Sequence, residues 1–231
     1  MSDDTRLNEW FVPKFGPLKF RVFIGLMFLP YTGMCVSFTI LGSMLAPTIT
    51  WDRVAAVSLI YGLALGISAH AADNLGSKKK PWGMYFNSKG LWMMVALGLI
   101  VAYSIAAYYI IYYVPNLLAV GVLEGFFVFA YNLELFRGRL HTDGCFIFSW
   151  GILPVFAGYI MQTNTFGPIP LLFSTLTAII SYVHIKISRR YKELRRQTVD
   201  YRSKKLEIYL KIISFGTIAI AAIAIWVRAT L

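Results

Sequence analysis

The sequence predicts an all-α, polytopic membrane protein: a bundle of about seven transmembrane helices. The prediction rests on composition, because 58% of the 231 residues are apolar, 14% are charged and the mean hydropathy is +0.62. A single anchor of roughly 20 apolar residues on a soluble domain would leave the rest of the chain with ordinary polarity. We therefore expect most of the chain to cross the bilayer.

Seven apolar runs end at charged residues, proline or glycine. They cover residues 20–46, 53–72, 91–114, 116–136, 144–162, 168–188 and 207–228. Each run is continuous in aliphatic and aromatic residues, whereas the strands of a membrane β-barrel would alternate apolar with polar residues. Residues 1–19 carry charges and prolines, so we expect an interfacial N-terminal arm followed by one helical domain over 20–231.

The basic residues predict the orientation of the chain in the membrane. With seven crossings, all 22 lysines and arginines except Arg53 and Arg228 fall on the side of the N-terminus. The positive-inside rule then places the N-terminus in the cytoplasm and the C-terminus outside, in a multi-pass protein of the cytoplasmic membrane. Contact with anionic membrane lipids explains the net charge of +11, so no nucleic-acid partner is expected.

The densest basic run, residues 186–205, includes Arg189 and Arg190. It is most simply interpreted as a helix extension in the headgroup region, with its arginines on lipid phosphates. The alternative is that some of these cations bind a phosphorylated substrate at a cytoplasmic pocket.

A first polar cluster follows the second apolar run, in the stretch SAHAADNLGSKKKPWG. His70, Asp73 and Asn74 are three and four residues apart, so they share one face of a helix, and Lys78, Lys79 and Lys80 follow directly. Ionisable groups at the membrane often mark a functional site. The alternatives are simple termination of the helix and, for His70, a satisfied histidine in the interior.

A second polar cluster lies along the fourth apolar run. Glu124 is at mid-membrane, and the stretch AYNLELFRGRLHTDG brings Tyr131 and Asn132 to the cytoplasmic end. A carboxylate in hydrocarbon costs several kcal/mol unless it is paired or protonated. We therefore expect Glu124 to face the protein interior, neutral or hydrogen-bonded.

Together with the number of apolar runs, the stretches SAHAADNLGSKKKPWG, AYNLELFRGRLHTD and FSWGILPVFAGY resemble the UbiA-type intramembrane prenyltransferase superfamily, as a divergent branch covering residues 20–200. The resemblance implies a cytoplasmic site that binds a prenyl diphosphate through Mg²⁺, with Asp73 in the position of the first metal-binding carboxylate and Asn74 beside it in the catalytic site. The residues that would contact the diphosphate or the isoprenoid are His70, Lys78, Lys79, Lys80, Tyr131, Asn132, Arg189 and Arg190.

The sequence departs from the family pattern in three places. Ser77 stands where a second Asp of the first motif is expected, and the stretch VHIKISRRYKEL replaces a second Asp-rich motif. The family usually has nine helices, whereas about seven are predicted here. Basic residues could therefore bind the diphosphate without a metal.

These observations lead to one leading hypothesis and two alternatives. The leading hypothesis is a UbiA-like protein that binds an isoprenoid diphosphate or lipid at its cytoplasmic face, with transfer of the prenyl group to a lipophilic acceptor as the possible reaction. The first alternative is a noncatalytic subunit that packs against partner subunits of a larger membrane complex. The second is a transporter in which Glu124 is a proton-linked group.

Overall fold

The computed structural model describes residues 6–77, 82, 85–197 and 201–231, and all regular structure in these ranges is helical. The elements, in chain order, are η1 (Arg6–Asn8), α1 (Leu18–Met27), α2 (Leu29–Met44), α3 (Trp51–Leu63), η2 (Ala64–Ala69), α4 (His70–Gly76), α5 (Ser88–Tyr112), α6 (Leu117–Asn132), η3 (Phe136–Gly138), α7 (Asp143–Ile147), η4 (Phe148–Ile152), α8 (Leu153–Thr163), α9 (Pro168–Gln197) and α10 (Tyr201–Thr230). The segments η2 and η4 are π-helical.

Within the described ranges, six helical stretches are long and apolar enough to cross a membrane. They are Leu18–Met44, Trp51–Gly76, Ser88–Tyr112, Asp143–Thr163, Pro168–Arg195 and Tyr201–Thr230, and the 16-residue α6 is a shorter apolar helix among them. The prediction of an all-α bundle is confirmed, and the six apolar helices support a multi-pass membrane protein.

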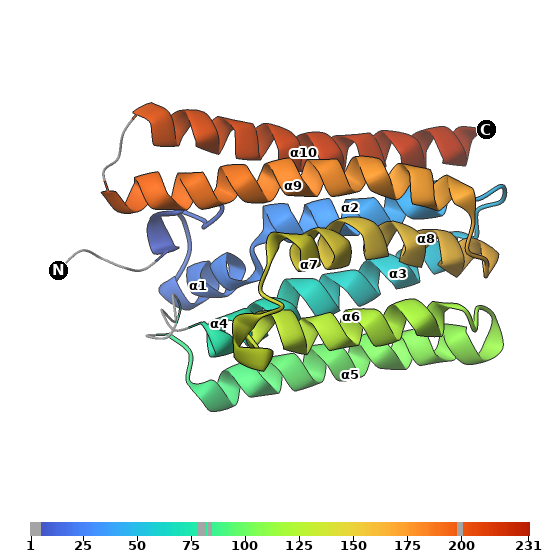
Figure 1. Cartoon of the computed structure of the whole chain (residues 1–231), viewed down its shortest axis with the longest axis horizontal. Helices are drawn as coiled ribbons and strands as arrows, with labels where there is room; N and C mark the ends of the chain where they lie inside the picture. The colour runs from blue at the N-terminus through green and yellow to red at the C-terminus, as the bar shows by residue number, and fades with distance from the viewer. Residues whose placement is uncertain (1–5, 78–81, 83–84, 198–200) are drawn as a thin grey trace.

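The helices lie side by side, and the chain runs back and forth along one axis (Figure 1). The C-terminal ends of α4, α6 and α9 and the N-terminal ends of α5 and α10 therefore lie toward one end, here called the basic end, and α7 begins on the same side but farther inside the bundle (Figure 1). Arg53 and Arg228 lie at the opposite end. Arg228 donates to the carbonyl of Ala46 at 2.6 Å, and Arg53 donates to the carbonyl of Gln162 at 3.2 Å. These two arginines satisfy carbonyl groups at the ends of neighbouring helices.

The apolar stretch predicted over residues 20–46 is present as Leu18–Met44, but it forms two helices and not one, because the chain breaks between α1 and α2. Phe28 has a left-handed backbone with φ of 48°, and Pro30 follows within the first turn of α2. Proline lacks an N–H and cannot continue the hydrogen bonds of a preceding helix, but it fits the first turn of a new one. The Phe28 ring packs 3.8 Å from the ring of Tyr31, measured between centroids.

Other helices begin or end at residues different from those predicted, and the local sequence explains why. The helix predicted over 116–136 ends at Asn132, because Glu134, Phe136 and Arg137 all have positive φ. The last two predicted helices are longer than expected: α9 continues through the basic run to Gln197, and α10 begins at Tyr201. The basic run is therefore largely a helix extension, as predicted.

Two glycines allow α2 and α8 to pack backbone against backbone. A Cβ atom added to Gly158 of α8 would collide with the backbone of Thr39, and one added to Gly42 of α2 would collide with the backbone of Val155. Ser43 donates a hydrogen bond to the carbonyl of Gly158 at 3.1 Å. Close packing of small residues is a main source of stability between membrane helices.

The N-terminal arm is bound to the ends of α9 and α10. The hydroxyl of Tyr191 donates to a carboxylate oxygen of Glu9 at 2.8 Å, and an oxygen of Glu207 lies 3.4 Å from the same hydroxyl. Arg195 donates to the carbonyl of Asn8 at 2.9 Å. Tyr191 is 2% exposed, so its own two polar contacts are partly shielded from water, whereas the contact of Arg195 with Asn8 is exposed.

Lys14 forms hydrogen bonds within the N-terminal arm. Its ammonium group donates to the carbonyls of Leu7 and Glu9 at 3.1 and 3.2 Å. Burial lowers the pKa of Lys14 below its ordinary value, and the nearby charges of Arg21 and Arg195 lower it further. The arm therefore lies in a cationic environment at the basic end.

We expect Tyr191→Phe to release the arm, because the substitution removes the only proton that the hydroxyl can share with Glu9 and Glu207. Loss of a buried hydrogen bond to a charged group costs about 1.5–3 kcal/mol. Faster amide hydrogen exchange over residues 6–12 would measure the release. Tyr201→Phe is the matched control, because Tyr201 is 76% exposed; equal exchange in the two variants would contradict the prediction.

Candidate functional site

An ion cluster at the basic end joins the start of α7 to α9. Thr142 caps α7 by accepting a hydrogen bond from the backbone N–H of Cys145 at 3.2 Å, and this fixes Asp143 as the first helical residue. The carboxylate of Asp143 pairs with Lys186 at 2.8 Å and with Arg189 at 2.6 Å. The side chains of Lys186 and Arg189 remain 52% and 44% exposed, so both cations can also reach a ligand.

Tyr131 lies beside this ion cluster. Its ring stacks on the ring of His141, with centroids 4.4 Å apart and planes at 21°. The His141 ring nitrogen Nδ1 is 3.1 Å from the Tyr131 carbonyl oxygen. Both Arg189 and Asp73 are close enough to Tyr131 to interact with it electrostatically. Asp73 of α4 and Arg189 of α9 therefore both lie within electrostatic range of Tyr131 of α6, and a single ligand site that includes all three residues stays a prediction.

The π-helical segment η2 leads directly into His70. The His70 ring is steeply inclined to the rings of Phe28 and Trp150, with interplanar angles of 73° and 67° and centroid distances of 5.8 and 5.6 Å. The His70 nitrogen Nδ1 is 3.4 Å from the carbonyl oxygen of Gly66, one turn earlier. These contacts favour the alternative in which His70 is an interior packing residue, although His70 and Asp73, one turn later, are both half-buried.

Two of the predicted polar residues are bound to the protein itself. The side-chain oxygen of Asn74 accepts a hydrogen bond from the backbone N–H of Trp82 at 3.1 Å, and Asn74 is 2% exposed. Asn132 donates to the carbonyl of Val128 at 2.9 Å within α6 and is also buried. Both amides fix local structure, and neither is bound to the Asp143 ion cluster.

The remaining predicted cations are Arg190, Lys78, Lys79 and Lys80. Arg190 pairs with Glu193 at 3.0 Å, and both side chains are more than half exposed. Neighbouring residues of a helix point in different directions, which explains why Arg189 joins the Asp143 ion cluster and Arg190 does not. Lys78, Lys79 and Lys80 lie outside the described residues.

Lys186 was not among the predicted site residues, and Asp143, in the stretch AYNLELFRGRLHTDG of the second polar cluster, was predicted only as a possible ligand of one Mg²⁺ ion. A signal for Lys186 is present in the sequence, because Lys186 and Arg189 are three residues apart and therefore share a face of α9. Their pairing with Asp143 is a long-range contact between α7 and α9, which helix periodicity does not reveal.

The described residues offer fewer converging oxygen ligands than Mg²⁺ prefers. Across the described ranges, no three His, Cys, Asp or Glu side chains converge on a point where they could hold a metal ion. Asp143 is already paired with two cations, and the Asn74 oxygen is bound to Trp82. Asp73 is left as the carboxylate that could contact Mg²⁺, and magnesium binding stays a prediction.

Comparisons with models of known protein families, with curated proteins and with solved structures found no match to this chain.

Proposed function

We propose that this protein is a UbiA-like multi-pass membrane protein that binds an isoprenoid diphosphate at its basic end, with that end in the cytoplasm. The observation that carries the proposal is the pair of half-exposed cations, Lys186 and Arg189, which converge on the single carboxylate of Asp143. A guanidinium has five N–H donors, so Arg189 can bind Asp143 and still donate to a phosphate.

The position of the cluster suits a ligand with an anionic head and a hydrocarbon chain. Asp143 is the first residue of one apolar stretch long enough to span a membrane, and Lys186 lies nine residues before the end of another at Arg195. A diphosphate bound here could remain in contact with water while its isoprenoid chain enters the bilayer or the bundle. Two cations against one carboxylate leave a net positive charge for an anion to neutralise.

The proposal is limited to binding. Ionisation of an allylic diphosphate by Mg²⁺ requires several oxygen ligands, with at least one or two carboxylates. The described residues supply Asp73 for that role, while Asp143 is paired with Lys186 and Arg189.

The test is a calorimetric titration of the purified protein, in lipid nanodiscs, with geranylgeranyl diphosphate. We expect binding that persists in EDTA and weakens as the salt concentration rises, because phosphate–cation attraction is screened by salt. Geranylgeraniol, which has the same chain without phosphates, should bind at least about tenfold more weakly.

Two further results of the same titration would change the conclusion. Absence of geranylgeranyl diphosphate binding with and without Mg²⁺ would contradict the proposal. Binding that requires Mg²⁺ and is lost in Asp73→Asn would support the predicted metal site and contradict binding by the cations alone.

A further inference from the structure

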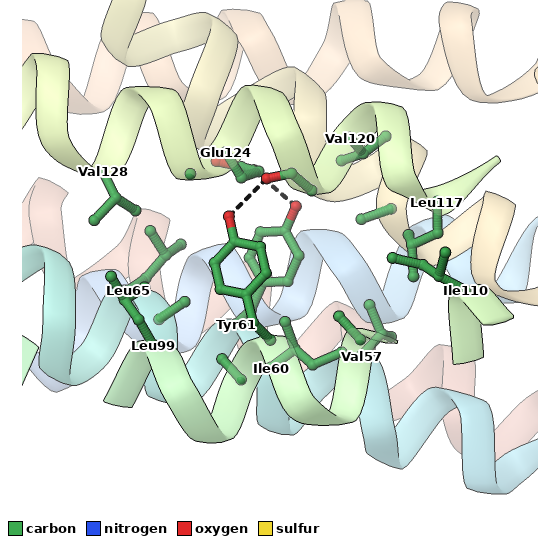
Figure 2. Close-up of a pocket in the computed structure, with 17 residues that line it drawn as sticks. Val57, Ile60, Tyr61, Leu65, Leu99, Ile110, Leu117, Val120, Glu124 and Val128 are labelled. Atoms are coloured by element: carbon green, nitrogen blue, oxygen red, sulfur yellow. Dashed lines mark hydrogen bonds between the residues drawn. The ribbon is translucent and has the colours of Figure 1, made fainter. Parts of the chain in front are cut away.

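Glu124 is bound within the bundle and does not indicate a second ligand site. The hydroxyl of Tyr61 donates to Oε1 of Glu124 at 2.7 Å, so the sequence expectation that Glu124 is hydrogen-bonded in the interior is confirmed (Figure 2). The cavity beside this pair has a volume of only about 60 Å³, and its wall is almost entirely apolar. Two charged groups without an ionic partner lie elsewhere, at the end of the bundle opposite the basic end.

These two groups are Asp52 and Arg53, which are neighbours in the first turn of α3. Within the described ranges, they form an ion pair neither with each other nor with another residue. Asp52 is exposed and Arg53 is half-buried. The chain therefore presents one carboxylate and one guanidinium, adjacent in sequence, whose charges a ligand could neutralise.

A group of four tyrosines around the C-terminal end of α5 contacts both charged side chains. This tyrosine cluster consists of Tyr108, Tyr109, Tyr112 and Tyr113, and the centroids of neighbouring rings are 5.2–6.5 Å apart. The hydroxyl of Tyr109 donates to Oδ2 of Asp52 at 3.1 Å. The guanidinium of Arg53 lies 5.2 Å from the centroid of the Tyr113 ring. The carboxylate and the guanidinium are thus both held against one aromatic surface.

Each charged group keeps hydrogen-bonding capacity for a ligand. Arg53 donates to the carbonyls of Met161 and Gln162 at 3.3 and 3.2 Å, and both bonds use Nη1. The atoms Nε and Nη2 can therefore donate to a phosphate, which a guanidinium binds well. Asp52 uses Oδ2 for Tyr109, which leaves Oδ1 for a donor such as an ammonium group. Faces of tyrosine rings also attract a cation.

Hydrogen bonds between loops make this end of the bundle a fixed platform. The backbone N–H of Thr50, just before α3, donates to the side-chain oxygen of Gln162 in α8 at 2.8 Å. The side chain of Asn116, just before α6, donates to the carbonyl of Asn164 at 2.6 Å. A site that is already ordered loses less conformational entropy when a ligand binds.

A ligand with one phosphate and one ammonium group matches both unpaired charges. Large apolar side chains beside them are exposed, including Trp51, Ile111 and Tyr112, so the ligand can carry hydrocarbon chains. A primary ammonium fits Asp52 better than a quaternary one, because it has N–H groups to donate. We propose that this end of the bundle binds the headgroup of phosphatidylethanolamine, with the phosphate on Arg53 and the ammonium group on Asp52 and the tyrosine cluster.

The test compares two photoactivatable lipids in nanodiscs of phosphatidylcholine. One is phosphatidylethanolamine and the other is phosphatidylglycerol, each with the same diazirine-bearing acyl chain, so that they differ only in the ammonium group of the headgroup. After irradiation, mass spectrometry locates the label. On peptides that cover residues 51–63 and 105–118, we expect at least about threefold more label from phosphatidylethanolamine, as for one exposed ion pair.

Asp52→Asn should abolish this preference between the two lipids. Asparagine keeps an oxygen that can accept the hydrogen bond from Tyr109, so the substitution removes the charge and leaves the local contact. Glu193→Gln is the matched control, because it removes a carboxylate from an exposed position of α9 near the basic end. The preference at residues 51–63 and 105–118 should be the same in Glu193→Gln as in the wild type.

Two outcomes would overturn the inference. One is equal labelling of these peptides by the two lipids in the wild type, a comparison that requires no substitution and so does not depend on the folding of a variant. The other is a preference for phosphatidylethanolamine that survives in Asp52→Asn, which would show that the carboxylate does not bind the ammonium group.

Discussion

Arg189→Gln is expected to weaken binding of geranylgeranyl diphosphate by about tenfold or more, because a charge-assisted contact to phosphate is lost and each factor of ten corresponds to about 1.4 kcal/mol. Asp143 holds Arg189 at 2.6 Å in the proposed ligand site, so little conformational entropy remains to be lost on binding. Calorimetric titration in nanodiscs measures the change.

Arg190→Gln is the matched control for this prediction. It removes the same charge from the adjacent position, but Arg190 pairs with Glu193 on an exposed part of α9. Its effect on affinity should stay within about twofold, as is typical of exposed charges. Equal losses in the two variants would show that overall surface charge, and not the Asp143 ion cluster, attracts the ligand.

Asp143→Asn should act in the opposite direction. The substitution removes the negative charge that Lys186 and Arg189 share, so more of their attraction is left for a phosphate. We expect affinity to rise several-fold while the protein loses a little stability. A fall in affinity comparable to that of Arg189→Gln would mean that Asp143 itself contacts the ligand or its metal ion.

Gly158→Val should be the most destabilising of the substitutions considered, because its side chain would be forced into the backbone of α2 at Thr39. Overpacking of a tight interface costs about 1–3 kcal/mol, and more where the obstacle is backbone. We expect either a large drop in the Tm of the detergent-solubilised protein or failure of the protein to accumulate in the membrane. Size-exclusion chromatography after heating measures the Tm.

Gly216→Val is the control for Gly158→Val. Gly216 lies in α10, and an added Cβ atom there meets no other atom within 4 Å. Its Tm should remain near that of the wild type. Similar losses in the two variants would show that β-branched residues in these helices are harmful in general, and that the contact between α2 and α8 has no special importance.

The fold class follows from the sequence because membrane helices are specified locally. An apolar run of sufficient length must satisfy its backbone hydrogen bonds within itself, so hydropathy alone indicates where the helices lie. The break at Phe28 was not predicted, because a left-handed phenylalanine has no sequence signature; Pro30 is the one local clue.

The end of the bundle at which some candidate site residues lie also follows from the local assignment of helices. Asp73, Tyr131 and Arg189 could be assigned to one end of the bundle from topology, because alternating helices bring their ends together. The roles of Asn74 and Asn132 could not, since a hydrogen bond to the N–H of Trp82 or to the carbonyl of Val128 depends on backbone geometry. Polar residues that stabilise a helix end and polar residues that contact a ligand look alike in sequence.

The π-helical segments η2 and η4 have a consequence for how this chain would align with distant relatives. A π turn contains one more residue than an α turn and absorbs it within the turn, so each later residue occupies the position around the axis that α-helical periodicity would give to the residue before it, a shift of about 100°. A relative without the bulge within Ala64–Ala69 would be one residue shorter inside a transmembrane helix, yet would present the same faces at both ends of that helix. Alignments that allow gaps only in loops would therefore shift His70 and Asp73 out of register, and homologous sites would be missed.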